Sequence, residues 1–232
     1  MYRDPLTKED KNKGIHHYLN PLLTSTIFLS LLFLTSSSYG ASIGKDTSPD
    51  GFWANCYLPL EERMKNVGGS DGSGLCVFTS LEHAAREQGI EALRGFRKWM
   101  EKRPGGGWPG KVDKMLAEYC REKNIPVPRY IQVQTWDPET MAAALRSGRM
   151  VSLTYSKSLT GRYGGQTIAH MVNLEHGGQG GHWGILDNNY IADIEWLTVD
   201  ELKRVHVPGG AWFVVFLDSG PPPNLKVKGG KK

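Results

Sequence analysis

The stretch Gly69-Ser70-Asp71-Gly72-Ser73-Gly74-Leu75-Cys76-Val77-Phe78-Thr79-Ser80 brings a cysteine to the point where a glycine-rich loop ends and a helix begins. The glycines in its first half favour turns and close approach of the backbone. From Val77 to Gln88 the apolar residues recur at helical spacing, and Gly89 is a typical helix stop. Cys76 is therefore predicted at a helix N-terminus, whose outward-pointing N–H groups favour a thiolate over a thiol.

A thiolate is a nucleophile at neutral pH, and it requires a base with which to exchange protons. The alternative interpretation is that Cys76 is a small apolar residue of the core, because free cysteine is among the residue types most often buried. The position between a glycine-rich loop and a helix favours the nucleophile. A partner for it is then expected in the second half of the chain.

Length and composition describe one ordinary globular domain. The chain has 232 residues, of which 39% are hydrophobic and 22% are charged, and this length is enough to bury a sizeable core. The formal net charge is +4, and the lysines and arginines are scattered rather than arranged in a stripe. A nucleic-acid partner is therefore not supported.

The first 40 residues differ from the rest in their pattern. An apolar run from Leu22 to Leu34 follows several basic residues and precedes Ser38-Tyr39-Gly40, which has small residues at the positions that matter for cleavage. This pattern is typical of a secretory signal peptide cut after Gly40, so export across a membrane is predicted. The run is short for a membrane span. The alternative is an uncleaved segment that anchors the protein to the membrane.

The remaining chain divides into three parts. Residues 41–51 are predicted to be a flexible lead-in, residues 52–218 the domain, and residues 219–232, rich in proline and lysine, a disordered tail. Helices are expected at 77–88, 91–103, 111–123 and 138–147, with a short one after the capping box at 198–201, and strands at 130–136, 151–155, 168–176, 182–187 and 211–217. This order predicts an α+β domain with a helical N-terminal half, an antiparallel sheet in the C-terminal half, and the site in the cleft between them.

The predicted hairpin of the last part supplies the partner for the cysteine. His170 opens its first strand, and Asp187 and Asn188 close the second. Because a hairpin brings its two outer ends together, His170 is expected near Asp187 or Asn188, as a base and the group that orients it. Cys76, on the helical half, then faces His170 across the cleft.

Metal binding is an alternative for the same residues. His170, His176 and His182 with Asp187 form a possible ligand set, but the chain lacks a short ligand pair such as His-x-x-x-His. We therefore expect no metal at these residues. His176 and His182 are expected to face solvent near the hairpin turn, and His83 and His206 to be ordinary histidines of the surface or of helix ends.

Four segments, in the right order, resemble the papain-like cysteine peptidases. These are Gly74-Leu75-Cys76-Val77-Phe78-Thr79-Ser80 (the nucleophile), Gly106-Gly107-Trp108-Pro109 (the Gly-Gly stretch that binds substrate), Ala169-His170-Met171-Val172 (the histidine strand) and Ile185-Leu186-Asp187-Asn188-Asn189 (the third member). The resemblance spans roughly residues 52–217. It implies a papain-like fold, peptide or protein substrates, and peptide-bond hydrolysis without a cofactor.

The resemblance also implies a role for each matched residue. Cys76 attacks the acyl carbon, His170 exchanges the proton, and Gly106 and Gly107 line the groove and hydrogen-bond the substrate backbone. Asp187 is the favoured third member, because the run is closest to branches with Asp there, such as bacterial effector peptidases and bacteriocin-leader peptidases. Asn188 remains the alternative, since one residue of register separates the two assignments.

One position departs from the family pattern. The family usually has glutamine six residues before the nucleophile as a side-chain oxyanion donor, and here that residue is Ser70. Serine is shorter, so Asn66 is a possible substitute, and the backbone N–H of Cys76 remains available. This departure motivates a rival hypothesis, a papain-like binding module without turnover. A second rival is acyl transfer on the same fold, by a transglutaminase-like enzyme or a cell-wall amidase.

Two further cysteines, Cys56 and Cys120, complete the set. In an exported protein such a pair can form a disulfide. The alternative is two buried free thiols, and the sequence leaves both open, because it does not show how close the two residues lie.

Overall fold

The computed structural model describes residues 40–218. The predicted signal peptide and the predicted proline- and lysine-rich tail lie outside the described residues, apart from Gly40. Within residues 40–218, no helix combines the length and the apolar character needed to cross a membrane.

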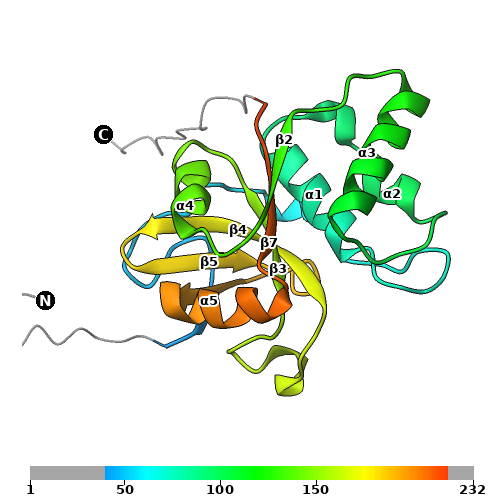
Figure 1. Ribbon diagram of the computed structural model, residues 1–232. Helices are drawn as coiled ribbons and strands as arrows, with labels where there is room; N and C mark the ends of the chain where they lie inside the picture. The colour runs from blue at the N-terminus through cyan, green and yellow to red at the C-terminus, as the bar shows by residue number, and fades with distance from the viewer. Residues whose placement is uncertain (1–39, 219–232) are drawn as a thin grey trace, which may run out of the picture. The chain divides into compact units, whose positions relative to one another are not determined.

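An antiparallel sheet runs through the described part of the chain, and its seven strands follow the order β1-β6-β5-β4-β3-β7-β2 (Figure 1). The strands are β1 (Ser42–Gly44), β2 (Tyr130–Gln134), β3 (Val151–Tyr155), β4 (His170–Gln179), β5 (His182–Leu186), β6 (Ile194–Thr198) and β7 (Trp212–Phe216). The central strands β3, β5 and β7 are buried at every residue. Such continuous burial indicates that both faces of the sheet are covered.

Helices cover the sheet on two sides. The helix α1 (Cys76–Glu87) packs against β3, β4 and β7, whereas α4 (Pro138–Arg146) packs against β3 and β4. Figure 1 shows α1 together with α2 (Phe96–Met100) and α3 (Pro109–Lys123) beside β2 and β7, and α4 and α5 (Val199–His206) on the other side. The predicted α+β class is confirmed.

The helix termini follow local chemistry. Asp137 accepts a hydrogen bond from the backbone N–H of Thr140 (3.0 Å), which caps α4, and Pro138 follows at the first helical position. The predicted capping box of α5 is present, because Thr198 and Glu201 bond to each other's backbone. The helix expected at 91–103 was wrong in extent: Gly95, with φ of 89°, separates a 3₁₀ turn (Glu91–Leu93) from α2.

The sheet begins earlier in the chain than predicted. Ser42 pairs with Trp196 and Gly44 with Ile194, so β1 lies on the edge of β6. The expectation of a flexible lead-in at 41–51 was wrong, because a three-residue strand is too short to show an alternating pattern and forms through its pairing partner. β6 was also missed.

The hairpin histidines are buried rather than solvent-facing. β4 and β5 continue to a turn at Gly180 and Gly181, so His176 and His182 lie within strands, at 0% and 6% exposure. His176 packs edge-on against Trp196 (ring centroids 5.6 Å apart), and His182 contacts Asp50. The predicted turn at 177–180 was placed too early. The expectation for His83 was also wrong, since it is fully buried in the middle of α1. His206 is the last residue of α5, a helix end as expected, and it is buried there.

Cys56 and Cys120 are free, buried thiols. Burial raises the pKa of both groups, which keeps them protonated and unreactive at neutral pH. Of the two alternatives left open by the sequence, the structure has the pair of free thiols.

Candidate active site

Cys76 is the first residue of α1, and its side chain is 8% exposed. Burial acts to raise the pKa of its thiol, but hydrogen bonding and charge from His170, together with the backbone N–H groups of Met171 and Val77, bring that pKa below its ordinary value. The cysteine at the predicted helix N-terminus therefore has a thiol that ionises more readily than an ordinary cysteine.

His170 opens β4, where it pairs with Tyr155 of β3. Its Nε2 atom lies 2.9 Å from Oδ1 of Asp187, which leaves Nδ1 as the ring nitrogen available to Cys76. Burial acts to lower the pKa of the imidazole, but Asp187 and Cys76 raise it to about 9. The ring is therefore held as an imidazolium between two acidic groups.

Asp187 follows the last residue of β5 and has no exposed surface. Besides His170, it accepts hydrogen bonds from the backbone N–H of Asn189 (2.8 Å) and from the hydroxyl of Tyr163 (2.6 Å). Burial acts to raise the pKa of the carboxyl, but these donors lower it. The carboxylate is ionised, and its negative charge stabilises the imidazolium.

Asn188 points away from the imidazole. Its Nδ2 atom donates to the carbonyl oxygen of Met171 (2.9 Å), to Oγ of Ser80 (3.0 Å) and to the carbonyl oxygen of Cys76 (3.2 Å). It thus ties β4 to the first turns of α1. The structure therefore brings Asp187, and not Asn188, to His170, whereas Asn188 links the helix to the sheet.

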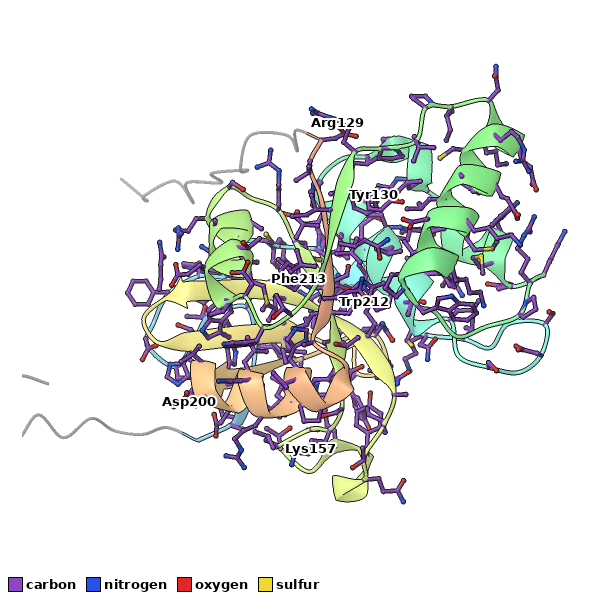
Figure 2. The ribbon with its side chains drawn as sticks, viewed as in Figure 1. Arg129, Tyr130, Lys157, Asp200, Trp212 and Phe213 are labelled. Atoms are coloured by element: carbon purple, nitrogen blue, oxygen red, sulfur yellow. The ribbon has the colours of Figure 1, made fainter. Side chains whose placement is uncertain are left out.

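A cavity of about 790 Å³ opens at Cys76 and His170. It is lined by Cys76 and His170 together with residues of the glycine segment, of α1, of the sheet and of loops, among them Gly106, Gly107, Val77, Asn66, Tyr163 and Trp212. Figure 2 labels Trp212 on β7, the strand that pairs with β3. The cavity is therefore bounded by both the helical part and the sheet.

The glycines of the segment before α3 allow close packing against the nucleophile loop. A Cβ atom on Gly107 would lie 2.6 Å from Cγ2 of Val77, and one on Gly105 would lie 1.9 Å from the carbonyl oxygen of Ser73. Gly106, with φ of 65°, donates its N–H to the carbonyl oxygen of Gly74 (2.8 Å). Glycine is required at positions 105 and 107 because a side chain there would push the segment away from Ser73 and Val77.

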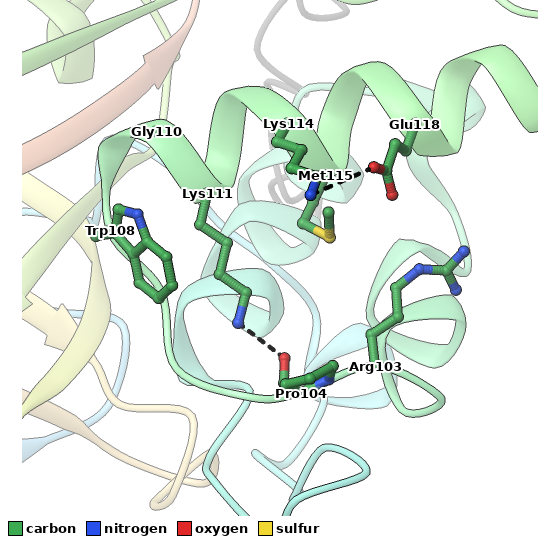
Figure 3. A pocket seen from close by; sticks show the side chains of 8 residues that line it. All are labelled: Arg103, Pro104, Trp108, Gly110, Lys111, Lys114, Met115 and Glu118. Carbon is green, nitrogen blue, oxygen red and sulfur yellow. Dashed lines mark hydrogen bonds and ion pairs between the residues drawn. The ribbon is translucent and has the colours of Figure 1, made fainter.

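A smaller cavity of about 400 Å³ shares Trp108 with the first one. Figure 3 shows its lining, in which Nζ of Lys111 donates to the carbonyl oxygen of Pro104 (2.8 Å) and Lys114 pairs with Glu118 (3.9 Å). Trp108 is 58% exposed and forms a wall common to both cavities.

The structure does not bring Ser70 to the cavity that Cys76 and His170 line. Ser70 is exposed, its N–H donates to the carbonyl oxygen of Arg103 (2.9 Å), and it is absent from the cavity lining. Asn66 does line the cavity, and a Cβ on Gly74 would lie 3.3 Å from its Nδ2 atom. Its Oδ1 atom is buried without a hydrogen-bond partner in the described part of the chain.

Sequence reasoning missed Tyr163 and Asn189 as members of this site. Both line the cavity, and Nδ2 of Asn189 donates to the Tyr163 hydroxyl (2.9 Å). Tyr163 belongs to a polar, glycine-containing loop without periodicity, so no local signal indicated it. Asn189 directly follows the Asp187-Asn188 pair, which is the one hint that the sequence contains.

Comparisons with known proteins give likenesses among solved structures alone. No family model matches the chain, and no curated protein matches it. Among solved structures, a protein from Bacillus anthracis described as a "putative C39-like peptidase" is 12% identical, with a TM-score of 0.43, and the match covers 63% of this chain and 90% of that one. A likeness of this size carries no argument about activity.

In residues 40–218, no three His, Cys, Asp or Glu side chains converge as a metal site.

Proposed function

We propose that this protein is an exported cysteine peptidase of papain-like layout, which hydrolyses peptide bonds through Cys76, His170 and Asp187. One observation carries the proposal: His170 lines the same cavity as Cys76, lowers the pKa of the Cys76 thiol, and is hydrogen-bonded to the buried Asp187 carboxylate. This is the arrangement of nucleophile, base and orienting group that covalent acyl chemistry requires.

The first half of the reaction forms an acyl-enzyme. The Cys76 thiolate attacks the carbonyl carbon of the substrate, and the carbonyl electrons move to its oxygen. When the tetrahedral intermediate collapses, the C–N bond breaks, and His170 transfers its Nδ1 proton to the leaving amine. Asp187 keeps Nε2 bonded throughout, which fixes the orientation of the ring.

The second half returns the enzyme to its starting state. His170, now neutral, takes a proton from a water molecule as that water attacks the thioester. The C–S bond breaks and the acyl group leaves as a carboxylic acid, which gives up its proton. Cys76 is again a thiolate beside an imidazolium, so one water is consumed for each peptide bond.

The oxyanion of the tetrahedral intermediate needs donors, and Asn66 replaces Ser70 as our candidate. Asn66 lines the cavity beside the loop that leads to Cys76, whereas Ser70 does not line it. The N–H of Cys76 lies in the first turn of α1, where backbone donors lack partners within the helix. Loss of one oxyanion donor typically costs 10²–10³ in kcat, which Asn66→Ala is expected to show.

The substrate backbone is proposed to lie along Gly106 and Gly107. The N–H of Gly107 makes no backbone hydrogen bond within the described residues, and the carbonyl of Gly106 accepts none there. An extended peptide can therefore add β-type hydrogen bonds at this edge. Trp108, at the end of the segment, then separates substrate positions on its two sides.

Cleavage of a peptide library tests the proposal, with wild type compared with Cys76→Ala. Hydrolysis adds the mass of one water across each cleaved bond, and the variant should give no products. A dominant amine adduct when a primary amine is present would instead assign acyl transfer. Covalent capture of a peptide electrophile by Cys76 without turnover would assign a binding module. Absence of both cleavage and capture contradicts the proposal.

A further inference from the structure

Tyr163 closes the hydrogen-bond network behind the catalytic pair. Its hydroxyl donates to Oδ2 of Asp187 (2.6 Å), whereas the other oxygen, Oδ1, accepts from His170 (2.9 Å) and from the N–H of Asn189 (2.8 Å). The same hydroxyl accepts from Nδ2 of Asn189 (2.9 Å). The two oxygens of the buried carboxylate thus have different donors, and Tyr163 donates to the oxygen that the imidazole does not contact.

The Tyr163 ring also bounds the imidazole. The ring centroids of Tyr163 and His170 lie 6.0 Å apart at 63°, and Tyr155 packs on His170 at 6.4 Å and 64°. Tyr163 lines the cavity, whereas Asp187 has no exposed surface, so the tyrosine connects the cavity wall to the buried carboxylate. A charge-assisted hydrogen bond is stronger when water is kept from it.

The backbone at Tyr163 is strained for a residue with a side chain. Its φ is 62°, in the left-handed region, and its neighbours Gly161, Gly164 and Gly165 also have positive φ. A non-glycine residue in this region carries a free-energy cost of roughly 1–2 kcal/mol. Glycine would meet the backbone requirement without this cost, so the side-chain contacts of Tyr163 offset it.

We infer that Tyr163 is a positioning residue, whose hydroxyl fixes the Asp187 carboxylate so that Oδ1 faces His170 and the imidazolium faces Cys76. This inference rests on the proposed function for its catalytic consequence, but the positioning itself acts on the ionisation of Cys76. The loop of residues 156–168, whose early residue Lys157 is labelled in Figure 2, is thereby part of the active site.

Two readouts with Tyr163→Phe test the inference, and Tyr190→Phe is the matched control. Tyr190 packs against the Tyr163 ring (centroids 5.2 Å apart), and the control leaves the hydroxyl bonded to Asp187 in place. The first readout is the pH dependence of iodoacetamide alkylation at Cys76. In Tyr163→Phe the His170 imidazolium is less well oriented toward Cys76. The pH at which alkylation of Cys76 begins to rise should therefore increase by about 0.5–1 pH unit. Tyr190→Phe should match wild type.

The second readout is peptide turnover. We expect kcat of Tyr163→Phe to fall about tenfold with KM unchanged, because the lost hydrogen bond acts on the reacting groups and not on substrate binding. Melting temperatures check that both variants fold. An alkylation profile identical to that of wild type overturns the inference, whatever happens to turnover. If wild type cleaves no peptide, the proposed hydrolysis fails, while the alkylation comparison still decides the role of Tyr163.

Discussion

The Nε2 atom of His170 lies 2.9 Å from Oδ1 of Asp187, across the hairpin of β4 and β5. The side chain of the next residue, Asn188, points the opposite way and bonds to Met171, Ser80 and Cys76 instead. Two adjacent polar residues at a strand end thus have different partners. Asp187 hydrogen-bonds to the imidazole, and Asn188 hydrogen-bonds to residues where α1 meets the sheet.

This division predicts opposite phenotypes for two neighbouring substitutions. Asp187→Ala should lower turnover by several orders of magnitude while the protein stays folded, because the imidazolium loses its counter-charge and its orientation. Asn188→Ala should lower the free energy of unfolding by about 1–3 kcal/mol, since buried acceptors lose their donor. Peptide kinetics and denaturant unfolding measure both. An inactive, stable Asn188→Ala beside an active Asp187→Ala would reverse the assignment.

Cys76 should be the most reactive of the three cysteines in the folded protein. Its pKa is lowered in spite of burial, whereas burial raises the pKa of Cys56 and Cys120. Iodoacetamide at mildly acidic pH should therefore label Cys76 alone, as read by mass spectrometry. His170→Ala should abolish this preference, because the imidazolium partner is removed. Equal labelling of all three cysteines in the native protein contradicts the prediction.

Glu175 should make stability fall as pH rises. It is fully buried on β4, its carboxyl oxygens have no hydrogen-bond partner in the described part of the chain, and Nη2 of Arg63 lies 3.7 Å away. Burial raises its pKa from 4.5 to about 8, although Arg63 opposes the shift. The folded state therefore binds the proton more tightly, and this contribution to stability is lost between about pH 4.5 and pH 8.

The matched variants are Glu175→Gln and Glu61→Gln, the latter at an exposed position. Glutamine cannot ionise, so Glu175→Gln should reduce the decline of unfolding free energy with pH, by up to about 1.4 kcal/mol for each pH unit in that window. Glu61→Gln should keep the wild-type dependence. Urea unfolding at a series of pH values measures the slopes, and identical slopes for wild type and Glu175→Gln refute the prediction.

Cleavage after Gly40 should create an ion pair at the sheet edge. The backbone nitrogen of Ala41 lies 3.1 Å from Oε1 of Glu201, and after cleavage this nitrogen is an α-ammonium group. N-terminal sequencing of the exported protein should begin at Ala41. A chain beginning at Ala41 should be about 0.3–1 kcal/mol more stable than one extended upstream, as expected for a partly exposed pair.

High salt should reduce this difference in stability, because it screens the pair. Glu201→Gln should remove most of it, since glutamine keeps the hydrogen-bonding shape of the capping box without the charge. An N-terminus at any other residue contradicts the proposed cleavage site. Equal stability of the two chains contradicts the ion pair.

Local pattern was sufficient for the parts of the site that lie on regular elements. The glycine-rich loop before an apolar helix placed Cys76 at a helix start, because caps, turns and 3.6-residue periodicity are properties of adjacent residues. The same holds for the β4–β5 hairpin, which brought His170 toward the Asp187-Asn188 pair. Local alternation also required these two side chains to point to opposite faces.

Only the tertiary structure determined whether Asp187 or Asn188 contacts the His170 imidazole. It also determined which other residues reach the site. The register of β4 on β5 shifts between Leu174 and His176. The alternation of residues in the sequence does not predict this irregularity. Asn66 and Tyr163 reach the cavity from loops, and β1 exists only because β6 offers an edge to pair with. These contacts join residues far apart in the chain, so only long-range packing determines them.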